Sequence, residues 1–157
     1  MAFNGTRLFR YALLMEAAAN VGGAIPMLLS PDTFLKLVVT GPNMINPATR
    51  SFTQWFAGMT LALTVPLLFS YPNPRPSHGG GPQVVPWRRM TYITLAMGEV
   101  ALGSVMAAQF MIGDSGLTDN ALLGGMALMG GIAAMRGFFL YVQPSWMAAQ
   151  ENSKKAQ

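Results

Sequence analysis

Four long apolar stretches dominate the chain, and shorter segments rich in proline, glycine and polar residues separate them. The stretches run over about residues 8–29, 52–70, 90–112 and 120–142. Each is close to the roughly 20 apolar residues that a helix needs to cross a bilayer. None alternates apolar and polar side chains as a membrane-spanning strand does, and a helix satisfies its own backbone hydrogen bonds inside lipid. The pattern therefore predicts an all-α fold, a transmembrane four-helix bundle in which residues 1–157 form one domain.

The segments between the stretches differ in character. Residues 30–50 contain three prolines, and their run FLKLVV can form a short helix at the membrane interface. Residues 71–89 contain five prolines and three consecutive glycines, a composition typical of an extended, flexible loop. Residues 113–119 are short enough for a tight hairpin, in which Thr118 or Asp119 caps the fourth helix.

Composition supports a membrane protein and excludes several other classes. Only 10% of the residues are charged, whereas a soluble domain has about 25%. The chain is 52% hydrophobic, which also excludes a disordered protein. The net charge of +4 comes from scattered basic residues without a basic stripe, so we expect no nucleic-acid partner. The chain contains no cysteine, so disulfides and cysteine-ligated zinc are excluded.

Basic residues near the ends of the stretches indicate the orientation in the membrane. The N-terminus, the 71–89 loop and the polar tail 148–157 lie on one side of the predicted bundle. That side has Arg7, Arg10, Arg75, Arg88, Arg89, Lys154 and Lys155, and the other side has only Lys36 and Arg50. We therefore expect both termini in the cytosol and the protein in an internal membrane, the endoplasmic reticulum. Glu16 interrupts the first stretch, which favours a retained helix over a cleaved signal peptide.

Two acidic residues occupy unusual positions, since Glu16 and Glu99 fall near the middle of the first and third stretches. A carboxylate at the centre of a bilayer costs about 2.5–3.5 kcal/mol on insertion scales, so it normally faces the bundle interior and marks a function. The first and third helices cross the membrane in the same direction, which places both carboxyls at a similar depth. We therefore predict that Glu16 and Glu99 meet in one cavity.

Four more polar residues accompany this pair. Asn20 is one helical turn from Glu16, and Tyr92 lies on the same face as Glu99. Gln54 lies near the non-cytosolic end of the second stretch, and Arg136 lies within the fourth. We expect Asn20, Gln54 and Tyr92 to position substrate or water, and Arg136 to tune a carboxyl or bind a polar end of the substrate. Structural roles stay open: a Glu16–Asn20 hydrogen-bond clamp, Gln54 at an interface, and Arg136 extending to the headgroups.

Two buried carboxyls in different surroundings can act as an acid and a base. One protonates an oxygen or an alkene, and the other accepts a proton from water. No metal, haem or nucleotide motif is present, so the predicted chemistry uses no cofactor. The substrate would be an apolar small molecule from the lipid membrane. Opening of an epoxide by water or by an internal hydroxyl fits this pair, and so does alkene protonation with cyclisation.

Several segments also resemble small four-span fungal membrane proteins of secondary-metabolite pathways, which are DoxX-like in shape. They are LLMEAAANVGGAIPMLLSPDTFL, TRSFTQWFAGMTLALTVPLLFSYP, RRMTYITLAMGEVAL and FFLYVQPSW. The epoxide hydrolases of aurovertin- and citreoviridin-type pathways look like relatives. This resemblance implies epoxide hydrolysis, with Glu16, Asn20, Gln54, Tyr92 and Glu99 as the matching polar positions.

Other classes stay open at the level of sequence. A carboxyl in the first of four spans is also the pattern of small proton-coupled transporters, although the 71–89 loop is long for them. A terpene cyclase or isomerase works with similar intramembrane acids, whereas a microsomal-type glutathione enzyme would need more intramembrane arginines than Arg136. The chain can also be a non-catalytic membrane assembly subunit. Small residues in the fourth stretch permit close helix packing and a homo-oligomer.

Overall fold

The computed structural model describes residues 4–72, 84–113 and 115–148, and these are almost entirely helical. The α-helices are α1 (Gly5–Leu29), α2 (Pro31–Val38), α3 (Pro47–Ser70), α4 (Val84–Ile112) and α5 (Asp119–Gly137). The short helices are η1 (Pro42–Met44), the π-helix η4 (Phe138–Val142) and η5 (Pro144–Met147). The all-α fold is confirmed, and four helices are long and apolar enough to cross a membrane: α1, α3, α4, and α5 continued by η4.

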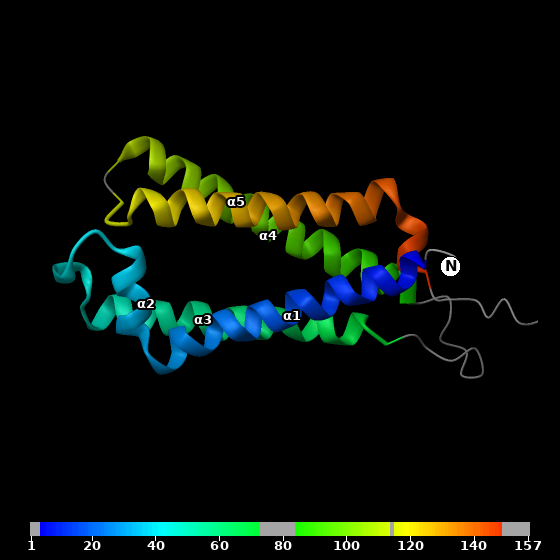
Figure 1. Cartoon of the computed structure of the whole chain (residues 1–157), viewed down its shortest axis with the longest axis horizontal. Coiled ribbons are helices and arrows are strands. Elements are labelled where there is room, and N and C mark those ends of the chain that lie inside the picture. The colour runs from blue at the N-terminus through cyan, green and yellow to red at the C-terminus, as the bar shows by residue number, and fades with distance from the viewer. Residues whose placement is uncertain (1–3, 73–83, 114, 149–157) are drawn as a thin grey trace, which may run out of the picture.

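The four long helices form two closely packed pairs, α1 with α3 and α4 with α5 (Figure 1). The pairs converge where α1 begins and α3 ends, which we call the terminal end, and separate toward the opposite end. A buried hydrophobic cluster lies at the terminal end and takes side chains from α1, α3, α4, η4 and η5. Its members are Phe9, Leu13, Leu67, Tyr92, Leu95, Phe139, Leu140 and Met147.

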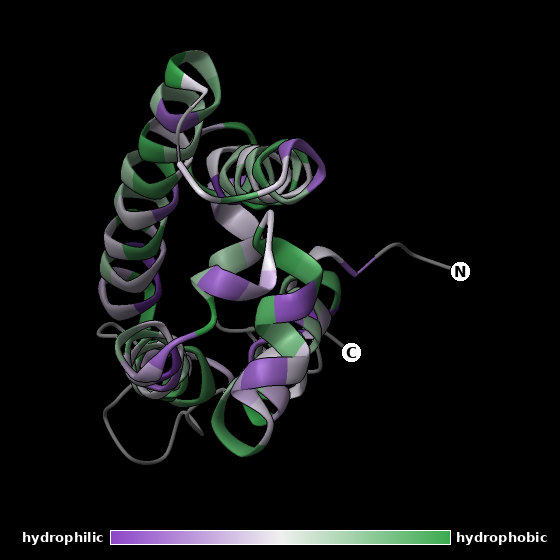
Figure 2. Cartoon of the chain, turned by 90° about the vertical axis from the view of Figure 1, so that its left-hand side faces the viewer, coloured by the Kyte–Doolittle hydropathy of each residue, from purple (hydrophilic) through white to green (hydrophobic). Residues whose placement is uncertain are grey.

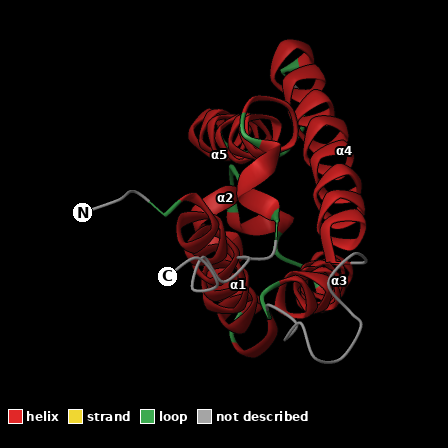
Figure 3. Ribbon diagram, turned by 90° about the vertical axis from the view of Figure 1, so that its right-hand side faces the viewer, coloured by secondary structure: helices red, strands yellow, loops and turns green. Residues whose placement is uncertain are grey.

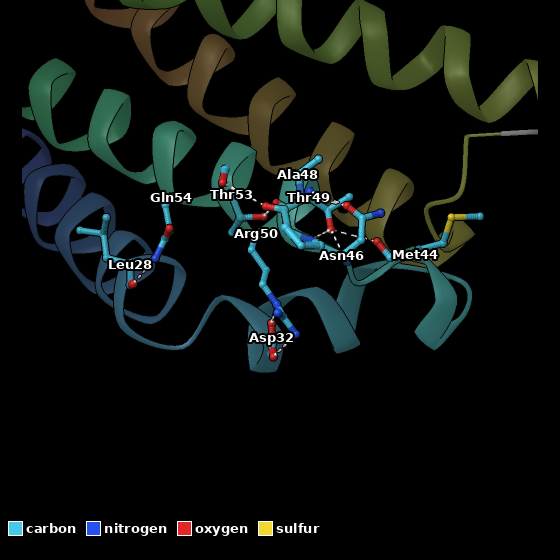
Figure 4. Close-up of polar contacts among 11 residues, drawn as sticks. Leu28, Asp32, Met44, Asn46, Ala48, Thr49, Arg50, Thr53 and Gln54 are labelled. Atoms are coloured by element: carbon cyan, nitrogen blue, oxygen red, sulfur yellow. Dashed lines mark hydrogen bonds and ion pairs between the residues drawn. The ribbon is translucent and has the colours of Figure 1, made fainter.

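Helix α2 connects the two pairs at the opposite end and lies between them when the bundle is viewed along its length (Figure 3). Its C-terminal side is tied to the start of α5, because the Thr118 amide donates to the Val38 carbonyl at 2.8 Å. Its N-terminal turn is tied to α3 by an ion pair, in which Arg50 Nε lies 2.5 Å from Asp32 Oδ1 (Figure 4). The helix expected from FLKLVV therefore exists and bridges the bundle.

Two helices begin earlier than the hydropathy pattern suggests. Helix α3 begins at Pro47 because the Asn46 side chain accepts hydrogen bonds from the Ala48 and Thr49 amides, and the Thr49 hydroxyl accepts one from the Asn46 amide. Helix α4 begins at Val84, so the loop predicted over 71–89 is wrong for its last six residues. Pro86 is tolerated there because amides in the first helical turn need no partner within the helix.

The rest of the predicted loop, residues 73–83, and almost all of the predicted tail lie outside the described residues. The hairpin prediction at 113–119 fits the structure at its end, where Thr118 caps α5 and its hydroxyl accepts from the Ala121 amide at 3.2 Å. The hairpin turn uses Gly113 and Gly116 with φ of 76° and 71°, a region that favours glycine.

The outer faces of the long helices are apolar, and hydrophobic residues recur along all of them (Figure 2). Large side chains on these faces are mostly exposed, such as Met15 (72% exposed), Phe69 (70%) and Met111 (79%). Hydroxyls on these helices bond to their own backbone, as expected where no water is available. Examples are Thr60 to the Phe56 carbonyl at 2.9 Å and Thr64 to the Thr60 carbonyl at 2.8 Å. Both features fit a helix bundle surrounded by lipid.

Arg88 does not lie in a loop, although the sequence pattern counts it among the basic residues of one. The structure places it in α4 with no exposed surface. Its Nε donates to the Ser70 carbonyl at 2.8 Å and its Nη1 donates to the Met147 carbonyl at 2.8 Å. Arg88 therefore joins α4 to the end of α3 and to η5, and closes the terminal end of the bundle.

Candidate functional site

Arg136 forms ion pairs with both intramembrane carboxylates. Its Nε lies 2.9 and 3.0 Å from the two oxygens of Glu99, and its Nη2 lies 2.8 Å from Glu99 Oε1. The same Nη2 donates to Glu16 Oε1. Arg136 is 1% exposed and Glu16 is 8% exposed. Three helices, α5, α4 and α1, are thus joined through one buried guanidinium.

Glu16 and Glu99 come close together through Arg136, which stands between them, and a cavity shared by both carboxyls stays a prediction. Arginine suits this position because its planar donors can serve two carboxylates at once. Two ionised carboxylates and one guanidinium carry a net charge of −1, so one further proton would neutralise the cluster. The Arg136 side chain turns into the bundle, where it is almost fully buried.

The π-helix that follows α5 holds the Arg136 side chain in this orientation. Arg136 lies in the last turn of α5, directly before the π-helix η4. The wider π-turn lets the consecutive residues Phe139 and Leu140 both point into the core, where they are 4% and 5% exposed. Insertions of this kind occur often at functional sites. The anchored residues of η4 fix the helix rotation that keeps Arg136 inside.

Tyr92 forms one wall of the site and has no exposed surface. The guanidinium carbon of Arg136 lies 5.0 Å from the centre of the Tyr92 ring, a cation–π contact. Phe9 and Phe139 hold the ring from other sides, with centroids 5.1 and 6.1 Å away. The ring position is therefore set by packing and leaves the hydroxyl available for chemistry.

Three buried polar atoms of this cluster have no hydrogen-bond partner among the described residues. They are Glu16 Oε2, the Tyr92 hydroxyl and Arg136 Nη1. Buried polar groups without a partner are rare in native proteins, and each one calls for an explanation such as a catalytic role. They are an acceptor, a hydroxyl and a charged donor. We call Glu16, Tyr92, Glu99 and Arg136 the carboxylate–arginine site.

Asn20 and Gln54 are not part of this site. Gln54 is exposed and its Nε2 donates to the Leu28 carbonyl at 3.1 Å, so it ties α3 to the last turn of α1 (Figure 4). Asn20 is half-buried one turn beyond Glu16, and its side chain forms no hydrogen bond with the part of the chain that the structure describes. The placement of Gln54 agrees with the interface alternative.

No group of three or more potential metal ligands of the His, Cys, Asp and Glu types occurs within residues 4–72, 84–113 and 115–148. Comparison with protein families, curated proteins and solved structures gave no matching family model, no matching protein and no matching structure. The resemblance to DoxX-like proteins and to epoxide hydrolases therefore stays a prediction. The site has to be interpreted from its own geometry.

Proposed function

We propose that the protein is a membrane-embedded, cofactor-free enzyme that opens an epoxide on an apolar natural product of polyketide or terpenoid type. The observation that carries the proposal is the buried meeting of Glu16, Glu99 and Arg136 beside the unpartnered Tyr92 hydroxyl. A site at mid-membrane depth in α1 and α4 is reached by molecules that dissolve in lipid. The proposal includes cytosolic termini and residence in the endoplasmic reticulum.

The two carboxyls take different roles because their oxygens differ in their contacts. Both oxygens of Glu99 accept hydrogen bonds from Arg136, whereas Oε2 of Glu16 has no partner among the described residues. Glu16 Oε2 is therefore the atom available to carry a proton to the epoxide oxygen. Glu99, held as a carboxylate by Arg136, is the base that accepts a proton from the attacking water.

The reaction balances without a redox step. Glu16 gives its proton to the epoxide oxygen as one carbon–oxygen bond breaks, and Tyr92 and Arg136 Nη1 donate hydrogen bonds to that oxygen. Water forms the new carbon–oxygen bond and loses a proton to Glu99, which yields a diol. When a hydroxyl of the substrate attacks instead, the product is a cyclic ether. One proton then returns from Glu99 to Glu16, and their shared partner Arg136 keeps them close.

Reconstituted protein and a panel of terminal, internal and polyene epoxides provide the test. In H2¹⁸O, we expect a diol with one labelled oxygen, and we expect Glu16→Gln and Glu99→Gln to reduce turnover by about 10²-fold or more. Asp32→Asn is the matched control, because Asp32 forms an ion pair on α2 outside the site. Full activity in both glutamine variants, or no product from any epoxide, contradicts the proposal.

A second candidate, proton-coupled transport, is favoured by one observation. The Glu16–Arg136 ion pair links the α1–α3 pair to the α4–α5 pair beside the packed core of the terminal end. Protonation of Glu16 would weaken this link and allow the pairs to move. A transporter would move an apolar substrate across vesicles under a pH gradient without changing it chemically, and product analysis separates the two functions.

A further inference from the structure

A groove on the lipid-facing side of the bundle lies between α4 and α5 and reaches Glu99. Its volume is about 300 Å³. The lining residues that matter here are Glu99, Gly103, Ser104, Ala107, Met129 and Gly130. Glu99 thus belongs both to the carboxylate–arginine site and to the wall of a groove that opens toward lipid.

Small residues on α4 and α5 leave this groove open, because larger side chains at their positions would fill the space. Gly103 and Ala107 lie one turn apart on α4 and share a face. A Cβ at Gly103 would lie 3.6 Å from the Met129 Cβ, so α4 and α5 approach each other at the groove floor. A Cβ at Gly130 would meet none of the described atoms within 4 Å, so the space beside Gly130 is open.

The polarity of the groove defines what it can accept. Ser104 donates its hydroxyl to the Val100 carbonyl at 2.8 Å and so presents little free polarity. The Glu99 side chain, 12% exposed, supplies the charge at one end of an otherwise apolar surface. A carboxylate in this position repels phosphate and other anions, and it accepts a hydrogen bond from water or from a hydroxyl. The size of the groove lies at the lower limit of ligand pockets, about 300–1,000 Å³.

We propose that this groove is a lateral port through which an uncharged apolar chain with a hydroxyl near its inner end enters from the bilayer and reaches Glu99. The inference rests on the proposed function for the fate of that hydroxyl, but the port itself is a binding site. A groove of about 300 Å³ between two helices has room for one extended chain more readily than for a polycyclic skeleton. Linear polyene or acyl-type epoxides that also carry a hydroxyl are therefore the substrate class that fits.

Binding can be measured without catalysis, because the chain contains no cysteine and accepts a single probe. A bimane fluorophore on Ser104→Cys reports from the groove, and the same label on Val105→Cys, 53% exposed on another face of α4, is the matched control. In lipid nanodiscs, a nitroxide-labelled long-chain alcohol is titrated. We expect saturable quenching at position 104, relieved by an unlabelled long-chain epoxide that carries a hydroxyl, and only linear quenching at position 105.

Two glycine variants test the groove itself. Gly130→Leu fills the open space and should remove the saturable quenching and raise KM at least tenfold for linear epoxides. Gly131→Leu is the control, because Gly131 is also a helical glycine at which an added Cβ would meet none of the described atoms within 4 Å, and it does not line the groove. Equal quenching at positions 104 and 105, or no effect of Gly130→Leu, overturns the port.

The outcomes separate the port from the chemistry. Saturable binding together with full turnover in Glu16→Gln and Glu99→Gln keeps the port and rejects the acid/base function. Turnover that depends on the carboxyls but is indifferent to Gly130→Leu keeps the function and rejects the port. Efficient disulfide formation between two copies through Ser104→Cys would show that a second copy covers this face, which also rejects the port.

Discussion

Arg136 on α5 contacts both oxygens of Glu99 on α4 through a single nitrogen, at 2.9 and 3.0 Å. The two residues are 37 positions apart in sequence and meet inside the bundle. The contact fixes Glu99 at the inner end of the groove. Nη2 of Arg136 pairs with both Glu99 and Glu16, and Nη1 has no hydrogen-bond partner among the described residues. This relationship determines what each substitution in the site should do.

Replacement of Arg136 by Met should destabilise the protein strongly. Loss of one partner from a buried ion pair costs about 3–5 kcal/mol, because the remaining charges stay buried without compensation. Arg136→Lys keeps the charge but loses the planar donor set, so its loss should be smaller. Thermal unfolding in detergent should show a stability that falls from the wild type to Arg136→Lys and further to Arg136→Met.

Combination variants distinguish charge from packing in this effect. Glu16→Gln with Glu99→Gln should recover a large part of the stability lost in Arg136→Met, because no carboxylate then remains unpaired. Equal stability of the single and triple variants would contradict a functional ion-pair cluster. It would indicate that Arg136 acts only by filling space.

The Tyr92 hydroxyl is expected to serve catalysis and to contribute little to stability. Tyr92→Phe keeps the ring that packs against Phe9 and Phe139, and the hydroxyl has no hydrogen-bond partner among the residues described. The free energy of unfolding should therefore not fall, because the removed hydroxyl is buried and makes no hydrogen bond with the described residues. If the hydroxyl donates to the epoxide oxygen, kcat should fall about 10²-fold. Unchanged kcat would remove Tyr92 from the mechanism.

Gln54 should matter for folding and not for turnover. Its amide bonds to the Leu28 carbonyl, at the end of the bundle where α2 lies. Gln54→Ala should cost about 1 kcal/mol, the usual net value of one hydrogen bond, with kcat and KM unchanged for an epoxide substrate. A selective loss of kcat with normal unfolding would place Gln54 back in the site, as the sequence pattern suggested.

The positions of the helices can be predicted from the sequence, whereas the partners of the polar side chains mostly cannot. Hydropathy gives four spans because lipid demands about 20 apolar residues from each, and the intramembrane position of Glu16 and Glu99 is visible for the same reason. Hydropathy cannot show which way Gln54 points, because helix rotation depends on packing against other helices. The sequence does not reveal the early start of α4, because prolines near 84–89 are compatible with a first helical turn as well as with a loop.

The same limit applies to Arg88, for which the sequence offers no signal of burial. A basic residue beside Arg89 in a proline-rich segment looks like a surface marker of orientation. In the structure, carbonyls of Ser70, Met147 and neighbouring residues hold it in place, and these are contacts between segments far apart in the chain. Without Arg88, six basic residues instead of seven remain on that side in the charge count, and the cytosolic orientation stays a prediction.

Arg88 provides a last prediction, one that separates stability from chemistry. Arg88→Met removes donors from carbonyls at the end of α3 and in η5, and leaves these acceptors without charged partners in a buried place. We expect a loss of about 3 kcal/mol or more in the free energy of unfolding. Arg89→Met is the matched control, since Arg89 is exposed on the same helix. The carboxylate–arginine site does not include Arg88, so the fraction that stays folded should keep the wild-type kcat. A variant as stable as Arg89→Met would show that the buried hydrogen bonds of Arg88 do not hold the terminal end together.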